Sequence, residues 1–164
     1  MKHKTTATII MFFLFIVCNA QTLCNPKNNA ISFELGKSGL IYNLNFDYKF
    51  QDKSFGIRLG LGSNFSKNLQ AFMTGGGGYY LFGHETHFFE LGIDLNYLSI
   101  TEASDDQKGV SLIYPDYPIK TFYTSGNIGY RKYGKKTLFR IGISPGLIKN
   151  DFLPGGYVSF GLTF

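Results

Sequence analysis

Apolar and polar side chains alternate along most of the chain from residue 30 onward. In LIYNLNFDYKF (40–50), large apolar residues take every second position, and Asn, Asp and Lys stand between them. FELGIDLNYL (89–98) and LFRIGIS (138–144) repeat the pattern. A period of two is typical of strands with one apolar and one polar face, and no stretch of comparable length fits the helical period of 3.6. The pattern therefore predicts an all-β domain.

Turn-forming residues divide this pattern into eight expected strands. The junction at 37–39 is ambiguous, because the apolar phase flips there within three residues. A hairpin at this point gives eight strands, whereas a bulge within one long strand gives seven. The phase of AFMTGGGGYYLF (71–82) is also undecided. The expected ranges are 31–37, 40–50, 55–62, 69–82, 87–100, 119–131, 137–148 and 156–164.

The connections alternate between short and long along the chain. An antiparallel barrel with turns at one end and longer loops at the other produces this alternation, as outer-membrane barrels do. The predicted fold is an eight-stranded antiparallel up-and-down transmembrane β-barrel. The short connections are 51–54, 83–86 and 132–136, and the longer ones are 63–68, 101–118 and 145–156.

The composition of the polar face distinguishes a membrane barrel from a soluble, lipocalin-like barrel. It combines glycines with equal numbers of acidic and basic side chains, which suits a narrow interior where charges must pair. The opposite face is nearly free of charge and would aggregate in water. We therefore expect lipid outside and a plug of ion pairs inside. The expected interior ion-pair residues are Glu34, Asp47, Lys49, Arg58, Glu90, Asp94, Arg131 and Arg140.

Aromatic residues gather beside the three short connections, as an aromatic girdle at the headgroup level requires. Strand propensity alone is the alternative explanation for these residues. The residues are Phe50, Phe55, Phe82, Phe88, Phe89, Tyr130, Tyr133, Phe139 and Phe164.

The N-terminal stretch has the layout of a secretory signal peptide. Lys2 and Lys4 precede the apolar run ATIIMFFLFIV, and small residues stand before Gln21. We expect cleavage after Ala20, with lipidation at Cys18 as the alternative. The domains are then a signal peptide (1–20), a short periplasmic tail (21–29) and the barrel (30–164).

Composition limits the other possibilities. Removing residues 1–20 lowers the formal net charge from +5 to +3, which gives no support for nucleic-acid binding. Charged residues make up only 16% of the chain, against about 25% in typical soluble domains. Cys24 is left as the single cysteine after cleavage, so no intramolecular disulfide is expected.

The last residues, YVSFGLTF, keep the alternating phase to the terminal Phe164. With this pattern, residues 30–164 resemble the small outer-membrane β-barrel class of the OmpA transmembrane domain and OmpX. The resemblance implies a monomer in the cell outer membrane, surrounded by membrane lipids and lipopolysaccharide and inserted by the barrel-assembly machinery. It also implies that a C-terminal insertion signal is formed by Val158, Phe160, Leu162 and Phe164.

Three groups resemble chemical motifs without meeting their requirements. GKS in LGKSG lacks the upstream glycine of a phosphate-binding loop, and a strand follows where a helix is needed. His84 and His87 in HETH have no cysteine near them, and Glu85 and Glu90 are the only nearby acids, which favours a polar turn over a zinc site. Glu90 and Asp94 share a strand face but stand about 13 Å apart, too far for a glycosidase pair.

These features predict a non-enzymatic protein without cofactor, metal or catalytic residues. The expected role is structural or one of surface interaction through the 101–118 and 145–156 loops. A narrow channel for ions or small solutes is the first alternative. A lipid-A-modifying barrel enzyme is the second, although His84 and His87 lie at the turn end rather than the loop end.

Overall fold

The computed structural model describes residues 27–37, 42–51, 53–64, 70–101, 119–148 and 151–164. The predicted signal peptide, most of the tail and the connection from residue 102 to 118 lie outside these ranges. Within the described ranges, no helix is long and apolar enough to cross a membrane.

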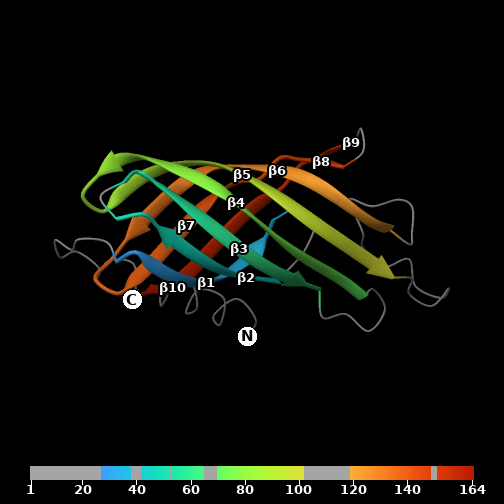
Figure 1. The fold of residues 1–164 in the computed structure, drawn as a ribbon, viewed down its shortest axis with the longest axis horizontal. Helices are drawn as coiled ribbons and strands as arrows, with labels where there is room; N and C mark the ends of the chain where they lie inside the picture. Colours follow the sequence, from blue (N-terminus) through green and yellow to red (C-terminus); the bar gives the residue numbers. More distant parts are fainter. Residues whose placement is uncertain (1–26, 38–41, 52, 65–69, 102–118, 149–150) are drawn as a thin grey trace, which may run out of the picture.

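Ten strands form one sheet, and eight of them close into an antiparallel barrel (Figure 1). The barrel strands are β1 to β7 and β10; the two short strands β8 and β9 extend the sheet beside β6. The eight-stranded fold predicted from the alternation is thus confirmed. The strands are β1 (Asn29–Gly36), β2 (Tyr42–Lys49), β3 (Phe55–Ser63), β4 (Gln70–His84), β5 (His87–Thr101), β6 (Ile119–Tyr133), β7 (Thr137–Ile143), β8 (Gly146–Ile148), β9 (Asp151–Leu153) and β10 (Gly156–Thr163).

Closure of the barrel comes from the pairing of β1 with β10. The register joins Ala30 to Thr163 at one end and Gly36 to Tyr157 at the other. All other neighbours in the barrel are consecutive in sequence except β7 and β10, which are separated by the β8–β9 hairpin. Closure leaves none of the eight strands as an open edge along the barrel wall.

The ambiguous junction at 37–39 is a hairpin, because β1 and β2 pair antiparallel from Asn29–Tyr48 to Leu35–Tyr42. The alternative of a bulge and seven strands is wrong. Gly36 and Lys37 both have positive φ (81° and 79°), and this left-handed pair turns the chain inward at the end of β1. The phase flip in the sequence marks this turn.

The predicted strand 137–148 and loop 145–156 are partly wrong. The strand is broken at Ser144–Pro145, and the expected loop contains the β8–β9 hairpin. Pro145 has no N–H to donate, but its carbonyl accepts from the N–H of Gly126 at 2.7 Å. β6 therefore changes partner at this break: Ile128–Tyr133 pair with β7, whereas Thr124 and Ser125 pair with β8.

The side chains of the barrel are distributed inside out. Leu59 and Ile93, on the outer face, keep 60% and 62% of their surface exposed, whereas Arg58 and Glu90 keep 2% and 0%. This distribution matches the faces predicted from the alternation. It also settles the phase of β4, where Met73 and Tyr79 point inward and Phe72 and Tyr80 outward.

Candidate functional site

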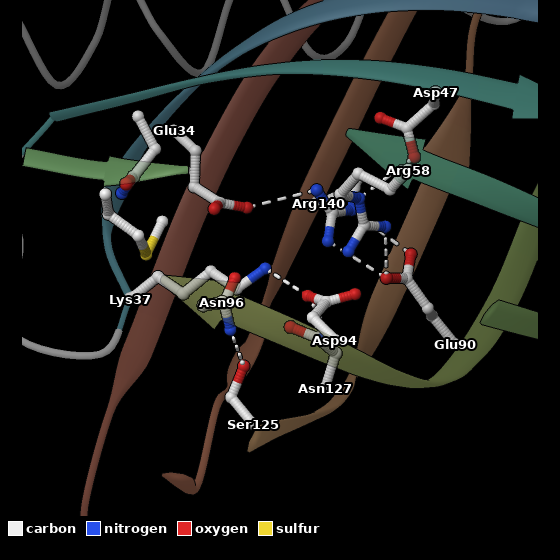
Figure 2. Close-up of polar contacts among 12 residues, drawn as sticks. Glu34, Lys37, Asp47, Arg58, Glu90, Asp94, Asn96, Ser125, Asn127 and Arg140 are labelled. Atoms are coloured by element: carbon white, nitrogen blue, oxygen red, sulfur yellow. Dashed lines mark hydrogen bonds and ion pairs between the residues drawn. The ribbon is translucent and has the colours of Figure 1, made fainter. Parts of the chain in front are cut away.

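The interior of the barrel is the candidate site, and its middle level is held by a cluster of six charged side chains. Each comes from a different strand, so the cluster ties six of the eight barrel strands together. In Figure 2, dashed lines join the Glu90 carboxylate to guanidinium nitrogens, and another joins Glu34 to Arg140. We call this group the Arg–carboxylate cluster; its members are Glu34 (β1), Asp47 (β2), Arg58 (β3), Glu90 (β5), Arg131 (β6) and Arg140 (β7).

Glu90 is the centre of the Arg–carboxylate cluster. Its Oε1 accepts from Arg58 Nη2 at 2.6 Å and from Arg140 Nη2 at 2.9 Å. Its Oε2 accepts from Arg131 Nε at 2.6 Å and from Arg140 Nε at 3.1 Å. One carboxylate thus neutralises parts of three guanidinium groups, all of them buried. Such charge-assisted bonds are the strong kind, and burial makes each partner necessary to the others.

The other two carboxylates of the cluster, Asp47 and Glu34, complete its charge balance. Asp47 Oδ1 accepts from Arg58 Nε at 3.1 Å and from Arg131 Nη2 at 3.0 Å, and Glu34 Oε2 accepts from Arg140 Nη1 at 3.0 Å. Three acidic and three basic groups therefore meet, and the cluster is formally neutral. Neutrality matters because an unpaired buried charge would cost several kcal/mol.

The register explains why Arg131 and Arg140 need a carboxylate between them. Arg131 and Arg140 stand directly opposite each other on β6 and β7. Like charges in this position repel and destabilise a sheet. Glu90 enters from β5 on the other side of β6 and bonds both of them.

Aromatic rings cover the remaining faces of the guanidiniums. Arg131 Cζ lies 4.2 Å from the centroid of the Tyr79 ring, and Arg140 Cζ lies 4.8 Å from that of Tyr157. Arg131 Nη1 also donates to the Tyr133 hydroxyl at 2.8 Å. Cation–π contacts of this kind add to the attraction where water is excluded.

Nearer the loop end of the barrel, Lys37 forms a second ion pair across the interior. Its Nζ lies 2.5 Å from Asp94 Oδ2, on the opposite wall, and Asn127 Nδ2 donates to the same oxygen at 2.7 Å (Figure 2). Asn96 Nδ2 donates to Ser125 Oγ at 3.0 Å beside them. The chain reaches this position through the left-handed turn at Gly36–Lys37.

The predicted ion-pair residues are brought together with one exception and one omission. Lys49 is the exception. It ends β2 with a half-buried side chain and makes no ion pair among the described residues. Lys37 was missed, because the alternation in sequence stops before it. The only available signal was the flip of phase at KSG, which marks a turn but not its inward direction.

Glycines make room for the polar side chains. A Cβ at Gly60 would lie 2.7 Å from Oδ1 of Asn45, and Cβ atoms at Gly75 and Gly77 would collide with Asn96 and Asp94. In β4, therefore, the inward glycines of GGGG accommodate the side chains of β5.

Both ends of the interior are apolar, which the sequence-based expectation of a wholly polar interior did not include. The loop-end apolar cluster lies beyond Asp94 and includes parts of β8 and β9. The turn-end apolar cluster lies below the Arg–carboxylate cluster and includes two rings predicted for the outer girdle, Phe88 and Tyr133, which in fact point inward. The loop-end cluster is Ala71, Met73, Leu98, Ile100, Tyr123, Ile148 and Leu153. The turn-end cluster is Ala30, Tyr79, Leu81, Tyr133 and Leu138, with the partly buried Phe88 packed against it.

The outer face carries aromatic contacts at the turn end. Phe50 packs against Phe55 with ring centroids 4.7 Å apart, and Phe139 packs against Phe160 at 5.0 Å. Phe82 and Phe89 form a third pair at 6.2 Å. These pairs come from neighbouring strands around the barrel, as an aromatic girdle requires.

The other candidate residues lie apart from the interior. His84 and His87 flank the tip of the β4–β5 turn and are exposed. Among the described residues, no group of three or more His, Cys, Asp or Glu side chains is arranged to hold a metal ion. Val158, Phe160, Leu162 and Phe164 follow the outer phase of β10 and its end, with Leu162 and Phe164 the most exposed of the four.

Comparison with known proteins gives a structural likeness only. No family model and no curated protein matches the chain. Among solved structures, the N-terminal β-barrel domain of Pseudomonas aeruginosa OprF matches with a TM-score of 0.61 and 16% identity, covering 84% of this chain and 99% of that one. The OprF domain shows that the two chains share a fold.

Two further solved structures match less closely. Ail, the attachment invasion locus protein of Yersinia pestis, has a TM-score of 0.45 and 9% identity over 84% of this chain and 99% of its own. Neisserial surface protein A has a TM-score of 0.43 and 13% identity over 82% of this chain and 92% of its own.

Proposed function

We propose that this protein is an integral outer-membrane β-barrel with a closed interior and a structural or surface-interaction role. The observation that carries the proposal is the inside-out distribution of side chains. Leu59 and Ile93 are exposed on the outer wall, while Arg58 and Glu90 are sealed inside. In water this outer wall would be a large aggregating surface, whereas in lipid it is the favourable one.

The fold supports the same location. A membrane-spanning structure must satisfy every backbone hydrogen bond internally, and a closed barrel does so. Pairing of β1 with β10 provides this closure. The likeness to the barrel domain of OprF, whose own fold is this one, agrees with the proposal.

The layered interior favours a plug over a channel. A solute would have to pass the loop-end apolar cluster, the Lys37–Asp94 pair, the Arg–carboxylate cluster and the turn-end apolar cluster in turn. Charged and apolar layers in series oppose both ions and apolar solutes. Eight strands also leave an interior only wide enough for side chains.

Conductance and heat-dependent migration test this proposal together. The protein is folded into lipid, inserted into a planar bilayer and compared with Arg58→Ala. We expect a shift in gel mobility between unboiled and boiled samples, and no stable openings for the unmodified chain. Stable openings, enlarged by Arg58→Ala, would support the narrow channel instead. A single mobility together with recovery from the soluble fraction would contradict the membrane location.

We propose further that the role is non-enzymatic. A lipid-A-modifying barrel needs its catalytic groups near the loop end, but His84 and His87 lie at the turn end. Identical lipid A from cells with and without the protein is the expected result. Contact with the membrane lipids and with the assembly machinery would involve the outer row of β10, which contains Val158, Phe160 and Leu162.

A further inference from the structure

Among the residues that the structure describes, most charged side chains outside the interior lie at the turn end. Of the described residues there, six are lysines and one, Glu85, is acidic; Asp52, outside the described residues, adds one more acid by sequence. At the loop end, the described charges outside the interior are Lys120 and Asp151. The turn end is therefore basic. Its lysines are Lys27, Lys49, Lys53, Lys132, Lys135 and Lys136.

Half of these lysines lie within five residues at the turn between β6 and β7. Lys132 follows Tyr130 in the outward phase of β6, and Lys135 and Lys136 are exposed in the turn itself. No ion pair joins any of the three to a carboxylate in the described part of the chain. Thr163 of β10 donates its N–H to the carbonyl of Lys136 at 3.1 Å, which joins this turn to the neighbouring strand.

A histidine and aromatic rings adjoin these lysines on the outer wall. Lys132 stands opposite His87 on β5 and opposite Phe139 on β7. Nδ1 of His87 lies 2.5 Å from the hydroxyl oxygen of Tyr130. The basic side chains thus stand at the turn-end border of the outer wall, and the aromatic rings of Tyr130 and Phe139 lie beside them. We call His87, Lys132, Lys135 and Lys136 the β6–β7 basic patch.

We propose that the β6–β7 basic patch binds the phosphate of an anionic phospholipid headgroup in the inner leaflet. The inference rests on the proposed membrane location. Rings such as Tyr130 and Phe139 mark the depth of the headgroups, and the lysines stand just outside that depth, where lipid phosphates lie.

The geometry favours a lipid over a free anion. Its two strand residues, His87 and Lys132, face outward from the barrel wall, on the same face as the exposed apolar surface of Ile128 and Ile141, which acyl chains would cover. One lipid can therefore occupy both surfaces at once, with its phosphate on the lysines and its chains on the wall. A free phosphate ion would gain only the first of these contacts.

Native mass spectrometry of the folded chain in detergent micelles tests the proposal. Phosphatidylglycerol and phosphatidylcholine with identical acyl chains are the probes. The patch variant is Lys132→Gln/Lys135→Gln/Lys136→Gln. The matched control, Lys27→Gln/Lys53→Gln/Lys120→Gln, loses the same charge elsewhere.

We expect the unmodified chain and the control to bind phosphatidylglycerol in preference to phosphatidylcholine. A lysine near anionic lipid is worth about 1 kcal/mol, or about fivefold in affinity. The triple variant should therefore lose at least about fivefold in its affinity for phosphatidylglycerol. Equal binding of phosphatidylglycerol by the patch variant and the control would overturn the proposal. Displacement of phosphatidylglycerol by inorganic phosphate at similar concentration would also overturn it, because the site would then be one for free anions.

The same samples separate this inference from the proposed function. If phosphatidylglycerol preference is absent but gel mobility still depends on heating, only the lipid site is wrong. If the unmodified chain shows no such dependence and no stable fold in detergent, the membrane location itself is wrong.

Discussion

The middle of the interior and its loop end are filled by opposite chemistries on the same strands. β5 contributes Glu90 to the Arg–carboxylate cluster and, eight residues further along, Leu98 to the loop-end apolar cluster. Both side chains are fully buried. The charged level depends on complete pairing, since each group is isolated from water. The apolar level depends on filled volume, since its members have few specific partners.

This difference has a consequence for tolerance to substitution. In the apolar cluster, one side chain can be shortened at the cost of a cavity, and the rest of the cluster stays satisfied. In the charged cluster, neutralising one group leaves its partners as uncompensated buried charges. The two levels should therefore respond differently to changes of similar size.

Glu90→Gln should have the largest effect on stability. The substitution keeps the shape of the side chain but leaves three guanidiniums facing only Glu34 and Asp47. We expect the free energy of unfolding to fall by about 3–5 kcal/mol. Urea unfolding in lipid vesicles, followed by gel mobility, measures it. Glu85→Gln, at the exposed tip of the β4–β5 turn, is the control; equal losses in both variants would contradict the central role of Glu90.

Leu98→Ala should have the next largest effect. It opens a cavity among Met73, Ile100 and Tyr123, and the expected loss is about 2–3 kcal/mol, toward the lower end for buried leucines. Leu95→Ala on the same strand is the matched control, because Leu95 faces outward. Lipid chains can refill the space there, so its loss should be smaller. The same unfolding assay applies, and a larger loss for Leu95→Ala would argue against the assigned faces.

Removing Lys37 should lower the free energy of unfolding by less, and the size of the loss should depend on whether Asp94 keeps its charge. Lys37→Gly leaves Asp94 unpaired but relieves the positive φ at that position, so we expect a loss of about 2 kcal/mol. Asp94→Asn in the same chain should restore part of this loss, since the buried carboxylate that lost its lysine partner is then neutral.

A double-mutant cycle on the same unfolding assay measures the coupling. Lys49→Gln is the comparison, because this lysine forms no ion pair among the described residues and should change stability by at most about 0.5 kcal/mol. Additive losses for Lys37 and Asp94 would show that their contact contributes nothing to stability.

The faces of the strands could be predicted because the period of two is a local property. Phe46, Leu59, Ile93 and Ile141 are exposed, and Asp47, Arg58, Glu90 and Arg140 are buried, as their positions in the alternation require. Mistakes arose where the local pattern ends. Lys49 keeps the inward phase but stands at the last position of β2, where the wall ends, and Phe88 and Tyr133 point inward although they border turns.

The sequence by itself determined the all-β class, the inward and outward faces of most strands and most of the charges that meet inside. Tertiary structure alone decided which charges pair, because contacts across the interior depend on register and on barrel closure, both set by residues far apart in the chain. It also decided that Glu90 is shared among three arginines, that Lys37 turns inward to Asp94, and that an apolar cluster lies toward each end of the interior. Alternation fixes the face on which a side chain lies, but the level it occupies along the barrel axis follows from how all the strands are staggered against one another.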